Sequence, residues 1–257
     1  MKLRFLPIFV FGIACAGMVR GEDSFVVRTA AQDASAPKFV AQLNNGRTIA
    51  TGFCVDLMRA IERSDPRIHF TGDQTWEPVT RLEADIQAGQ LDLACGFERN
   101  HARLEHYRYL EPAIFPVQYF LVARADDPVV IASWDEVRAL GDNGIVLINR
   151  GVLTPKMRAL AGIKYDDGII SGKANLQKLL IGRGRFFLYR TPGLQEEILA
   201  AGASGKVRIC SNAMFREDFY MVISKNAPAG MVVALNNALK NLAGTGELAR
   251  LQQLWLK

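Results

Sequence analysis

The segment Gly52–Glu62, which reads GFCVDLMRAIE, decides the fold class of this chain. Its apolar residues at positions 55, 57, 58 and 61 recur at the spacing of one helix face. Short apolar runs with the character of buried strands lie on both sides of it, at Val26–Thr29 and at Ile68–Thr71. A strand, an amphipathic helix and a second strand in this order predict a parallel α/β unit with helices on both faces of the sheet.

The same alternation of apolar runs and amphipathic stretches continues to the end of the chain. Val79–Gln87 predicts the next helix and Leu91–Cys95 the next buried strand. We expect further strands at Val117–Arg124, Gly144–Asn149, Gly168–Ile170, Arg185–Tyr189 and Phe219–Ser224, and further helices at Trp134–Leu140, Pro155–Ala161, Asn175–Ile181, Gly193–Ala201, Met231–Leu242 and Glu247–Leu256. The pattern predicts two similar α/β lobes, each a mainly parallel sheet flanked by helices, with a hinge between them.

The first 21 residues predict a secretory signal peptide. Lys2 and Arg4 precede an apolar run, and Val19 and Gly21 are small enough for the −3 and −1 positions of a signal peptidase site. The run is too short and too interrupted to predict a membrane-spanning helix. We therefore expect cleavage after Gly21 and export to the periplasm. Lipidation at Cys15 is the alternative.

Much of the basic character of the chain lies in this signal peptide. Its removal takes away Lys2, Arg4 and Arg20 and no acidic residue, so the formal net charge falls from +5 to +2. The remaining basic residues are scattered, and this distribution does not predict binding to nucleic acid. The rest of the 257-residue chain is long enough for one large or two small domains.

Five short motifs follow one another in a distinctive order. They are the strand at 25–29, Gly52–Leu57 (GFCVDL), Ala88–Leu93 (AGQLDL), Asn100–Arg103 (NHAR) and Gly244–Leu256 (GTGELARLQQLWL). In this order the chain resembles the family 3 extracellular solute-binding proteins, the periplasmic receptors that deliver polar amino acids and related small solutes to ABC transporters. The resemblance covers nearly the whole chain after the signal peptide.

The resemblance implies a type II periplasmic binding fold with a discontinuous first lobe. This lobe would comprise residues 22–115 and 219–257, and the second lobe residues 118–215. The chain would cross between the lobes near Phe115–Val117 and again near Phe215–Phe219. The implied protein is a monomer that needs no cofactor, closes on a small-molecule ligand and then docks on an inner-membrane ABC permease.

Three cysteines remain after the signal peptide, at positions 54, 95 and 210. In an oxidising compartment an odd count permits one disulfide and one free thiol. The resemblance places Cys54 and Cys95 at the ends of elements that meet around the ligand cleft, so a bridge between them is one expectation. Three buried free thiols are the alternative. Because CxxC and paired-histidine spacings are absent, the sequence does not predict a metal site.

The resemblance assigns the ligand contacts of the first lobe mainly to the segment after its last strand. Arg103 stands where the family has an arginine that binds the ligand carboxylate, and its planar guanidinium matches a carboxylate bidentately. Asn100 replaces the usual threonine and keeps a hydrogen-bonding side chain. Gly96 and Glu98 lie in the same segment, and Trp76 is a candidate wall over the ligand. A solvated arginine and a core tryptophan are the alternatives.

The second lobe departs from the family pattern. Gly151 matches the glycine of the family's Gly-Ser-Thr or Gly-Thr-Thr segment, but Val152 and Leu153 stand where family members carry hydroxyl side chains, so backbone donors are retained and side-chain donors are lost. Arg190 stands where the family has an acid that pairs with the ligand's ammonium group. An arginine there would attract an anion, which predicts a carboxylate-bearing solute. A shifted alignment instead leaves Arg190 in solvent and Asp33 or Glu98 to receive an ammonium.

These features predict a periplasmic solute-binding protein rather than an enzyme. His69, His101 and His106 fall in no nucleophile–base order, and HExxH, P-loop and GxGxxG motifs are absent, so we assign no catalytic residue. One alternative is a periplasmic enzyme of the same fold, similar to cyclohexadienyl dehydratase, with Glu98 as the acid and Arg103 holding a carboxylate. A ligand-binding sensor subunit is the other.

Overall fold

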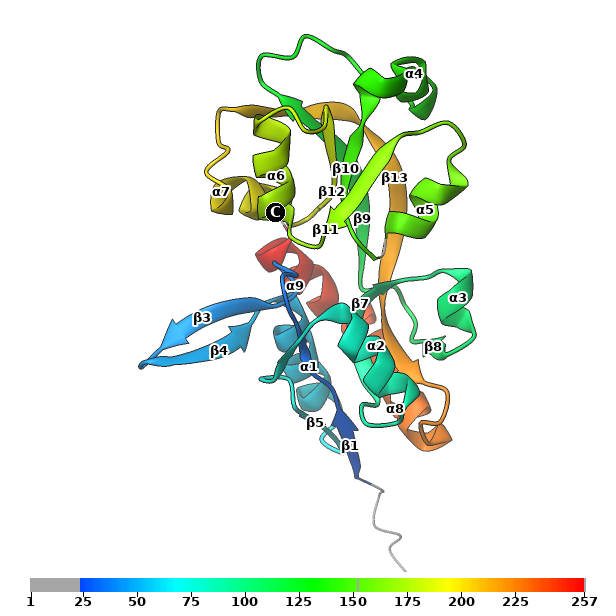
Figure 1. Ribbon diagram of the computed structural model, residues 1–257. Coiled ribbons are helices and arrows are strands. Elements are labelled where there is room, and N and C mark those ends of the chain that lie inside the picture. Colours follow the sequence, from blue (N-terminus) through cyan, green and yellow to red (C-terminus); the bar gives the residue numbers. More distant parts are fainter. Residues whose placement is uncertain (1–23, 152, 257) are drawn as a thin grey trace, which may run out of the picture.

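The structure, a computed structural model, describes residues 24–151 and 153–256 and shows two α/β lobes stacked end to end (Figure 1). The predicted signal peptide, residues 1–21, and Val152 lie outside the described residues. Within the described residues no helix has both the length and the apolar character needed to cross a membrane. The predicted two-lobed α/β fold is confirmed.

The first lobe is organised around the predicted helix and its flanking strands. Helix α1 (Phe53–Ser64) leads into β5 (Ile68–Thr71), and β5 pairs in parallel with β1 (Phe25–Arg28). The apolar stripe of α1 is buried, as its spacing predicts. Helix α2 (Val79–Gln87) follows, and then the fully buried strand β7 (Leu93–Glu98).

Further elements complete the first lobe. They are the short strands β2 (Ala31–Gln32), β6 (Trp76–Glu77) and β8 (Tyr107–Tyr109), and the helices α3 (His101–Leu104), α8 (Ala229–Gly244) and α9 (Glu247–Trp255). The two C-terminal helices lie beside α1, so the end of the chain returns to the lobe where the described residues begin (Figure 1).

The second lobe repeats the alternation of strands and helices. Its strands are β10 (Val146–Asn149), β11 (Tyr165–Ile169) and β12 (Phe186–Thr191), and its helices are α4 (Trp134–Ala139), η1 (Gly141–Gly144), α5 (Leu153–Ala159), α6 (Gly172–Leu180) and α7 (Leu194–Ala200). Strand β10 pairs in parallel with both β11 and β12.

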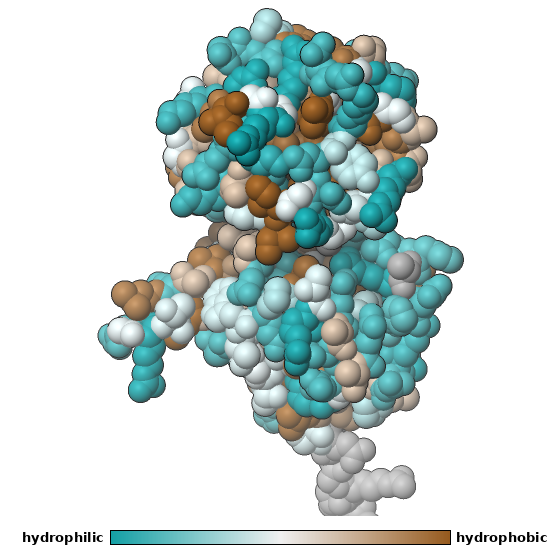
Figure 2. Space-filling view, in the orientation of Figure 1, coloured by the Kyte–Doolittle hydropathy of each residue, from teal (hydrophilic) through white to brown (hydrophobic). Residues whose placement is uncertain are grey.

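Two long strands connect the lobes. Strands β9 (Phe115–Arg124) and β13 (Val207–Ser224) pair antiparallel with each other, and they join β12 of the second lobe to β7 of the first in one seven-stranded sheet. This sheet is mixed: helix-connected strands run parallel, whereas β9 and β13 run antiparallel to their neighbours. Figure 2 shows the narrow waist between the two lobes, and Figure 1 shows β9 and β13 running from one lobe to the other. The predicted division into a first lobe of residues 22–115 and 219–257 and a second lobe of residues 118–215 remains a prediction.

The first lobe also contains a hairpin that the sequence patterns did not predict and a disulfide. A hairpin of β3 (Val40–Asn44) and β4 (Arg47–Thr51) projects from the lobe (Figures 1 and 2). Asn45 and Gly46 form its turn with positive φ angles of 48° and 77°, as a type I′ turn requires. The second feature is a disulfide between Cys54 and Cys95, which confirms the bridge and leaves Cys210 as a buried free thiol.

Candidate ligand-binding cleft

A cavity of about 230 Å³ lies between the lobes. The first lobe contributes Lys38, Gly96, Phe97, Glu98 and Arg103 to its lining, the second lobe contributes Asn149, Arg150, Leu153 and Arg190, and the connecting strands contribute Tyr119 and Phe219. Pockets for drug-sized ligands measure roughly 300–1,000 Å³, so this one suits a smaller solute. A larger hollow of about 670 Å³ lies on the second lobe alone. When the lobes move relative to each other, only a cavity lined by both of them changes its shape. The cavity between the lobes is therefore the candidate ligand site.

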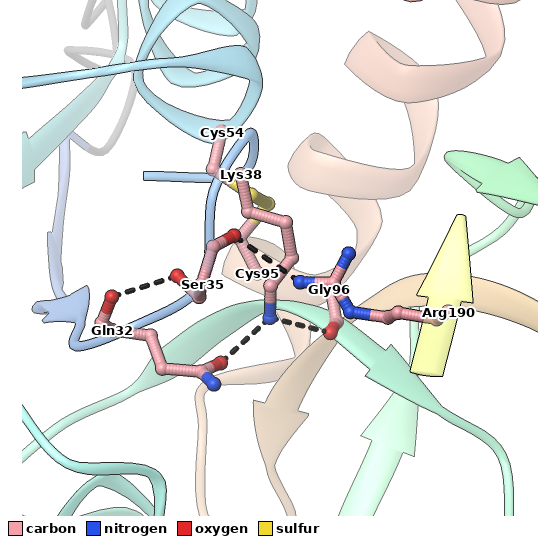
Figure 3. The surroundings of a disulfide bond; sticks show 7 residues. All are labelled: Gln32, Ser35, Lys38, Cys54, Cys95, Gly96 and Arg190. Carbon is pink, nitrogen blue, oxygen red and sulfur yellow. Dashed lines mark hydrogen bonds between the residues drawn. A yellow bond between two sulfur atoms is a disulfide. The ribbon is translucent and has the colours of Figure 1, made fainter. Parts of the chain in front are cut away.

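Lys38 is the residue at this site that the sequence patterns did not reveal. Its side chain is 2% exposed, and its Nζ donates hydrogen bonds to Gln32 Oε1 (2.6 Å) and to the carbonyl of Gly96 (3.0 Å; Figure 3). Burial, followed by the nearby charges of Arg190 and Arg103, holds the pKa of Lys38 well below its usual value. Both acceptors are neutral, and Lys38 forms no ion pair with an acid among the described residues. An anion in the cavity would therefore be its first charged partner.

The GFC motif explains why Lys38 enters the cavity. The backbone N–H groups of Phe53 and Cys54 donate to the carbonyls of Pro37 and Lys38, each at 3.0 Å, and so tie this loop to the start of α1. A Cβ at position 52 would lie 2.6 Å from the carbonyl oxygen of Lys38, and the φ angle of Gly52 is +116°. Glycine is therefore required there.

The disulfide holds the other side of the Lys38 pocket. Cys54 begins α1, and its partner Cys95 precedes Gly96, whose carbonyl accepts from Lys38 (Figure 3). A Cβ at position 96 would lie 2.3 Å from Cδ of Lys38, so only glycine leaves room for the buried lysine. The bridge thus joins the two backbone segments that position Lys38.

Arg103 lines the cavity, as predicted, but it has a partner within its own lobe. Its side chain donates to Glu83 through Nε (2.9 Å) and Nη2 (2.6 Å), and its Nη1 donates to the carbonyl of Glu98 (3.3 Å). The guanidinium also lies 4.4 Å from the ring centre of Phe97. The predicted contact Asn100 does not line the cavity, and its Oδ1 accepts from the backbone N–H of Arg103 (2.9 Å). Asn100 therefore positions the segment that carries Arg103.

Arg190 is buried in the cavity rather than in solvent. It is 9% exposed, and its Nη2 donates to the carbonyl of Ser35 (3.3 Å; Figure 3) and to that of Ala36 (3.2 Å), both in the opposite lobe. Its Nη1 donates to the carbonyl of Pro192 in its own lobe. Arg190 therefore connects the lobes directly, and among the described residues it forms no ion pair with an acid.

Glu98 provides the buried carboxyl group of the cavity. It is 1% exposed, and neither oxygen accepts a hydrogen bond from the described residues. Nζ of Lys156, from α5 of the second lobe, lies 3.2 Å from its Oε2 and also forms an ion pair with Glu217. Burial raises the pKa of Glu98, although the charges of Lys156 and Arg103 oppose this rise.

The remaining predicted residues divide into two groups. Gly96 lines the cavity, and so does Asp33, at its exposed rim. Gly151 does not line it, and the backbone N–H of Gly151 donates to Thr154 Oγ1 (3.3 Å); Val152 lies outside the described residues. Trp76 lines a neighbouring hollow of about 470 Å³ instead. Among the described residues no cluster of three or more histidine, cysteine or acidic side chains is suited to a metal ion.

A two-lobed α/β fold with a cavity lined from both lobes is typical of proteins that bind a small solute between two hinged lobes. The model of the bacterial extracellular solute-binding proteins, family 3, matches residues 29–257. The chain belongs to this family, and the resemblance seen in its motifs is confirmed. No curated protein matches its sequence.

Solved structures with the same fold are distant in sequence. An amino acid ABC transporter substrate-binding protein from Streptococcus pneumoniae, bound to L-arginine, has a TM-score of 0.71 at 15% identity over 89% of this chain and 93% of that one. A histidine kinase sensor domain with similarity to periplasmic binding proteins has a TM-score of 0.73 at 15% identity, over 91% and 96%. The GluR0 ligand-binding core from Nostoc punctiforme, in complex with L-glutamate, has a TM-score of 0.68 at 21% identity, over 89% and 98%. At these identities the similarity establishes the fold alone.

Proposed function

We propose that this protein captures a small carboxylate-bearing solute between its lobes in the periplasm and delivers it to an ABC transporter. The observation that carries this proposal is the pair of buried basic side chains, Lys38 and Arg190, whose hydrogen-bond acceptors are all neutral. A buried charge is costly unless it is paired, and an anionic ligand would supply the missing partner. Export by a cleaved signal peptide and docking on a permease belong to the same proposal.

Binding must also favour the closed arrangement of the lobes. A ligand that contacts the open and closed states equally would shift nothing, so the contacts that matter join both lobes. Arg103 and Lys38 approach from the first lobe and Arg190 from the second. A carboxylate-bearing solute held by both sets would stabilise the closed state, which is the form that a transporter would receive.

A panel of solutes tests the proposal on the purified mature protein. We expect mono- and dicarboxylates to raise the melting temperature more than lysine, arginine or glutamine, because the cavity offers cations to an anion. In calorimetry the affinity should weaken as salt rises, since screening reduces charge attraction. Micromolar binding of lysine, arginine or glutamine without binding of simple acids would contradict the proposal.

The same panel addresses a second function, that of a dehydratase-like enzyme. The observation in its favour is Glu98, a buried carboxyl whose pKa is raised by burial and whose charged partner within 4 Å is Lys156 of the second lobe. A carboxyl whose pKa is raised by burial is suited to general acid catalysis. A prephenate-like acid is therefore included, and its conversion to product, instead of its binding, would favour this function.

Arg103→Ala is expected to weaken binding of the carboxylate that the panel identifies by roughly ten- to a hundredfold. Hydrogen bonds to charged groups contribute about 1.5–3 kcal/mol, and this variant removes such donors. Because Arg103 pairs with Glu83 and covers Phe97, we also expect a modest loss of stability. The control is Arg81→Ala, an exposed arginine on α2 that pairs with Asp85 and does not line the cavity. Calorimetry showing equal affinities for wild type and Arg103→Ala would remove Arg103 from the site.

A further inference from the structure

Lys38, Arg190 and Arg103 are arranged around two aromatic rings of the cavity. Lys38 Nζ lies 6.0 Å from the ring centre of Phe97, and Arg103 Cζ lies 4.4 Å from the same ring centre. Lys38 Nζ lies 5.5 Å from the ring centre of Phe219, and Arg190 Cζ lies 5.9 Å from that one. Lys38 and Arg190 thus both lie near the ring of Phe219, and Lys38 and Arg103 both lie near the ring of Phe97.

The hydrogen bonds made by Lys38 and Arg190 leave donors available for a ligand. An ammonium has three N–H donors, and Lys38 uses two of them, toward Gln32 and Gly96. Arg190 bonds three carbonyls through its Nη atoms, and its Nε–H has no acceptor among the described residues. Arg103, by contrast, directs both Nε and Nη2 toward Glu83. The least neutralised positive charge of the cavity therefore lies at Lys38 and Arg190.

We infer that Lys38 and Arg190 form an anion subsite of their own, distinct from Arg103, and that the ligand is a small diacid with one carboxylate at each position. This inference rests on the proposed function and specifies its ligand class. Two like charges so close together in a nonpolar setting are unfavourable when the cavity is empty, and a carboxylate between them reverses that effect. Burial first, and then the charges of Arg190 and Arg103, lower the pKa of Lys38, which agrees with its position near both guanidinium groups.

The disulfide and the glycines around Lys38 show that the subsite is built into the fold. The start of α1 holds the backbone of Lys38, and the Lys38 side chain fills the space beside Gly96. Ser35 and Ala36, which accept from Arg190, lie in the same loop as Lys38. The first lobe therefore positions both cations, and the subsite is complete only when the lobes meet.

The test compares matched diacids and monoacids on the full mature protein. The probes are dicarboxylates of three to six carbons and the half-amide of each, which keeps the size and removes one charge. By calorimetry we expect at least one diacid to bind wild type about tenfold or more tightly than its half-amide. Lys38→Met should bring that ratio close to one. The control, Lys240→Met, changes an exposed lysine of α8 and should preserve the ratio.

The outcomes separate the two proposals. If half-amides and monoacids bind wild type as tightly as diacids do, the diacid inference is wrong and carboxylate binding stands. If Lys38→Met is folded by circular dichroism and keeps the preference, Lys38 is not part of the subsite and the inference is likewise wrong. If no carboxylate binds wild type, the proposed function and the inference fall together. The wild-type comparison decides the ligand class even where Lys38→Met does not fold.

Discussion

The double variant Cys54→Ser/Cys95→Ser is expected to lose about 4 kcal/mol of unfolding free energy. The bridge spans 41 positions of the sequence, and closing a loop of that length restricts the unfolded chain by this amount in the chain-entropy account. Guanidinium denaturation of the two proteins measures the difference. Cys210→Ala, which truncates a buried thiol that forms no bridge, is the matched control and should cost only roughly 1 kcal/mol.

The same variant should also bind its ligand more weakly than wild type. The bridge joins the start of α1, which holds the backbone of Lys38, to the strand that presents Gly96. Without it the ammonium of Lys38 loses its fixed position in the cavity. An unfolding free energy equal to that of wild type would show that the disulfide does not stabilise the fold.

Arg190→Ala is expected to lower affinity for the identified carboxylate about a hundredfold and to open the ligand-free protein. Two of its hydrogen bonds cross from the second lobe to the carbonyls of Ser35 and Ala36. Bonds from a charged donor contribute roughly 1.5–3 kcal/mol each, so losing both shifts the closed-to-open equilibrium strongly. Small-angle X-ray scattering should report a larger radius of gyration, and calorimetry the weaker binding.

Arg183→Ala provides the control for this second experiment. Arg183 is an exposed arginine that precedes β12, and its side chain lies outside the cleft. We expect this variant to match wild type in both measurements. An Arg190→Ala protein with an unchanged radius of gyration and unchanged affinity would mean that the contacts of Arg190 neither hold the lobes together nor bind the ligand.

The elements that sequence predicts best are those whose burial follows a local period. The bounds predicted for β5 and α2, Ile68–Thr71 and Val79–Gln87, are those of the structure. The apolar stripe of α1 is likewise buried, because the helix covers one side of the lobe. Side-chain spacing alone determines which residues share a face, so the neighbours need not be known.

The β3–β4 hairpin and strand β13 escape this reasoning for different reasons. The β3–β4 hairpin is exposed on most of its surface, so no alternation of buried and exposed residues marks it, even though Asn45 and Gly46 carry a turn signal. Strand β13 begins at Val207 rather than at Phe219 because it pairs with β9, far away in the sequence. Its first half owes its extended form to that partner, which also makes the sheet mixed.

The candidate site shows the same division. The family motifs identified Arg103, Gly96, Glu98 and Arg190 as candidates, and all four line the cavity. They did not indicate that Arg103 pairs with Glu83, that Asn100 lies outside the cavity lining, or that Trp76 faces a separate hollow. Lys38 had no distinguishing signal, because a lysine in a loop is usually solvated.

The sequence by itself determined the α/β alternation, the family and most of the charged candidates, since periodicity and short motifs are local properties. The tertiary structure decided which charges remain without a charged partner. Lys38 and Arg190 are held by a side-chain amide and backbone carbonyls, and in a sequence any residue could supply such carbonyls. Only the folded chain places them, because two of the three carbonyls that accept from Arg190 lie more than 150 residues away in the opposite lobe.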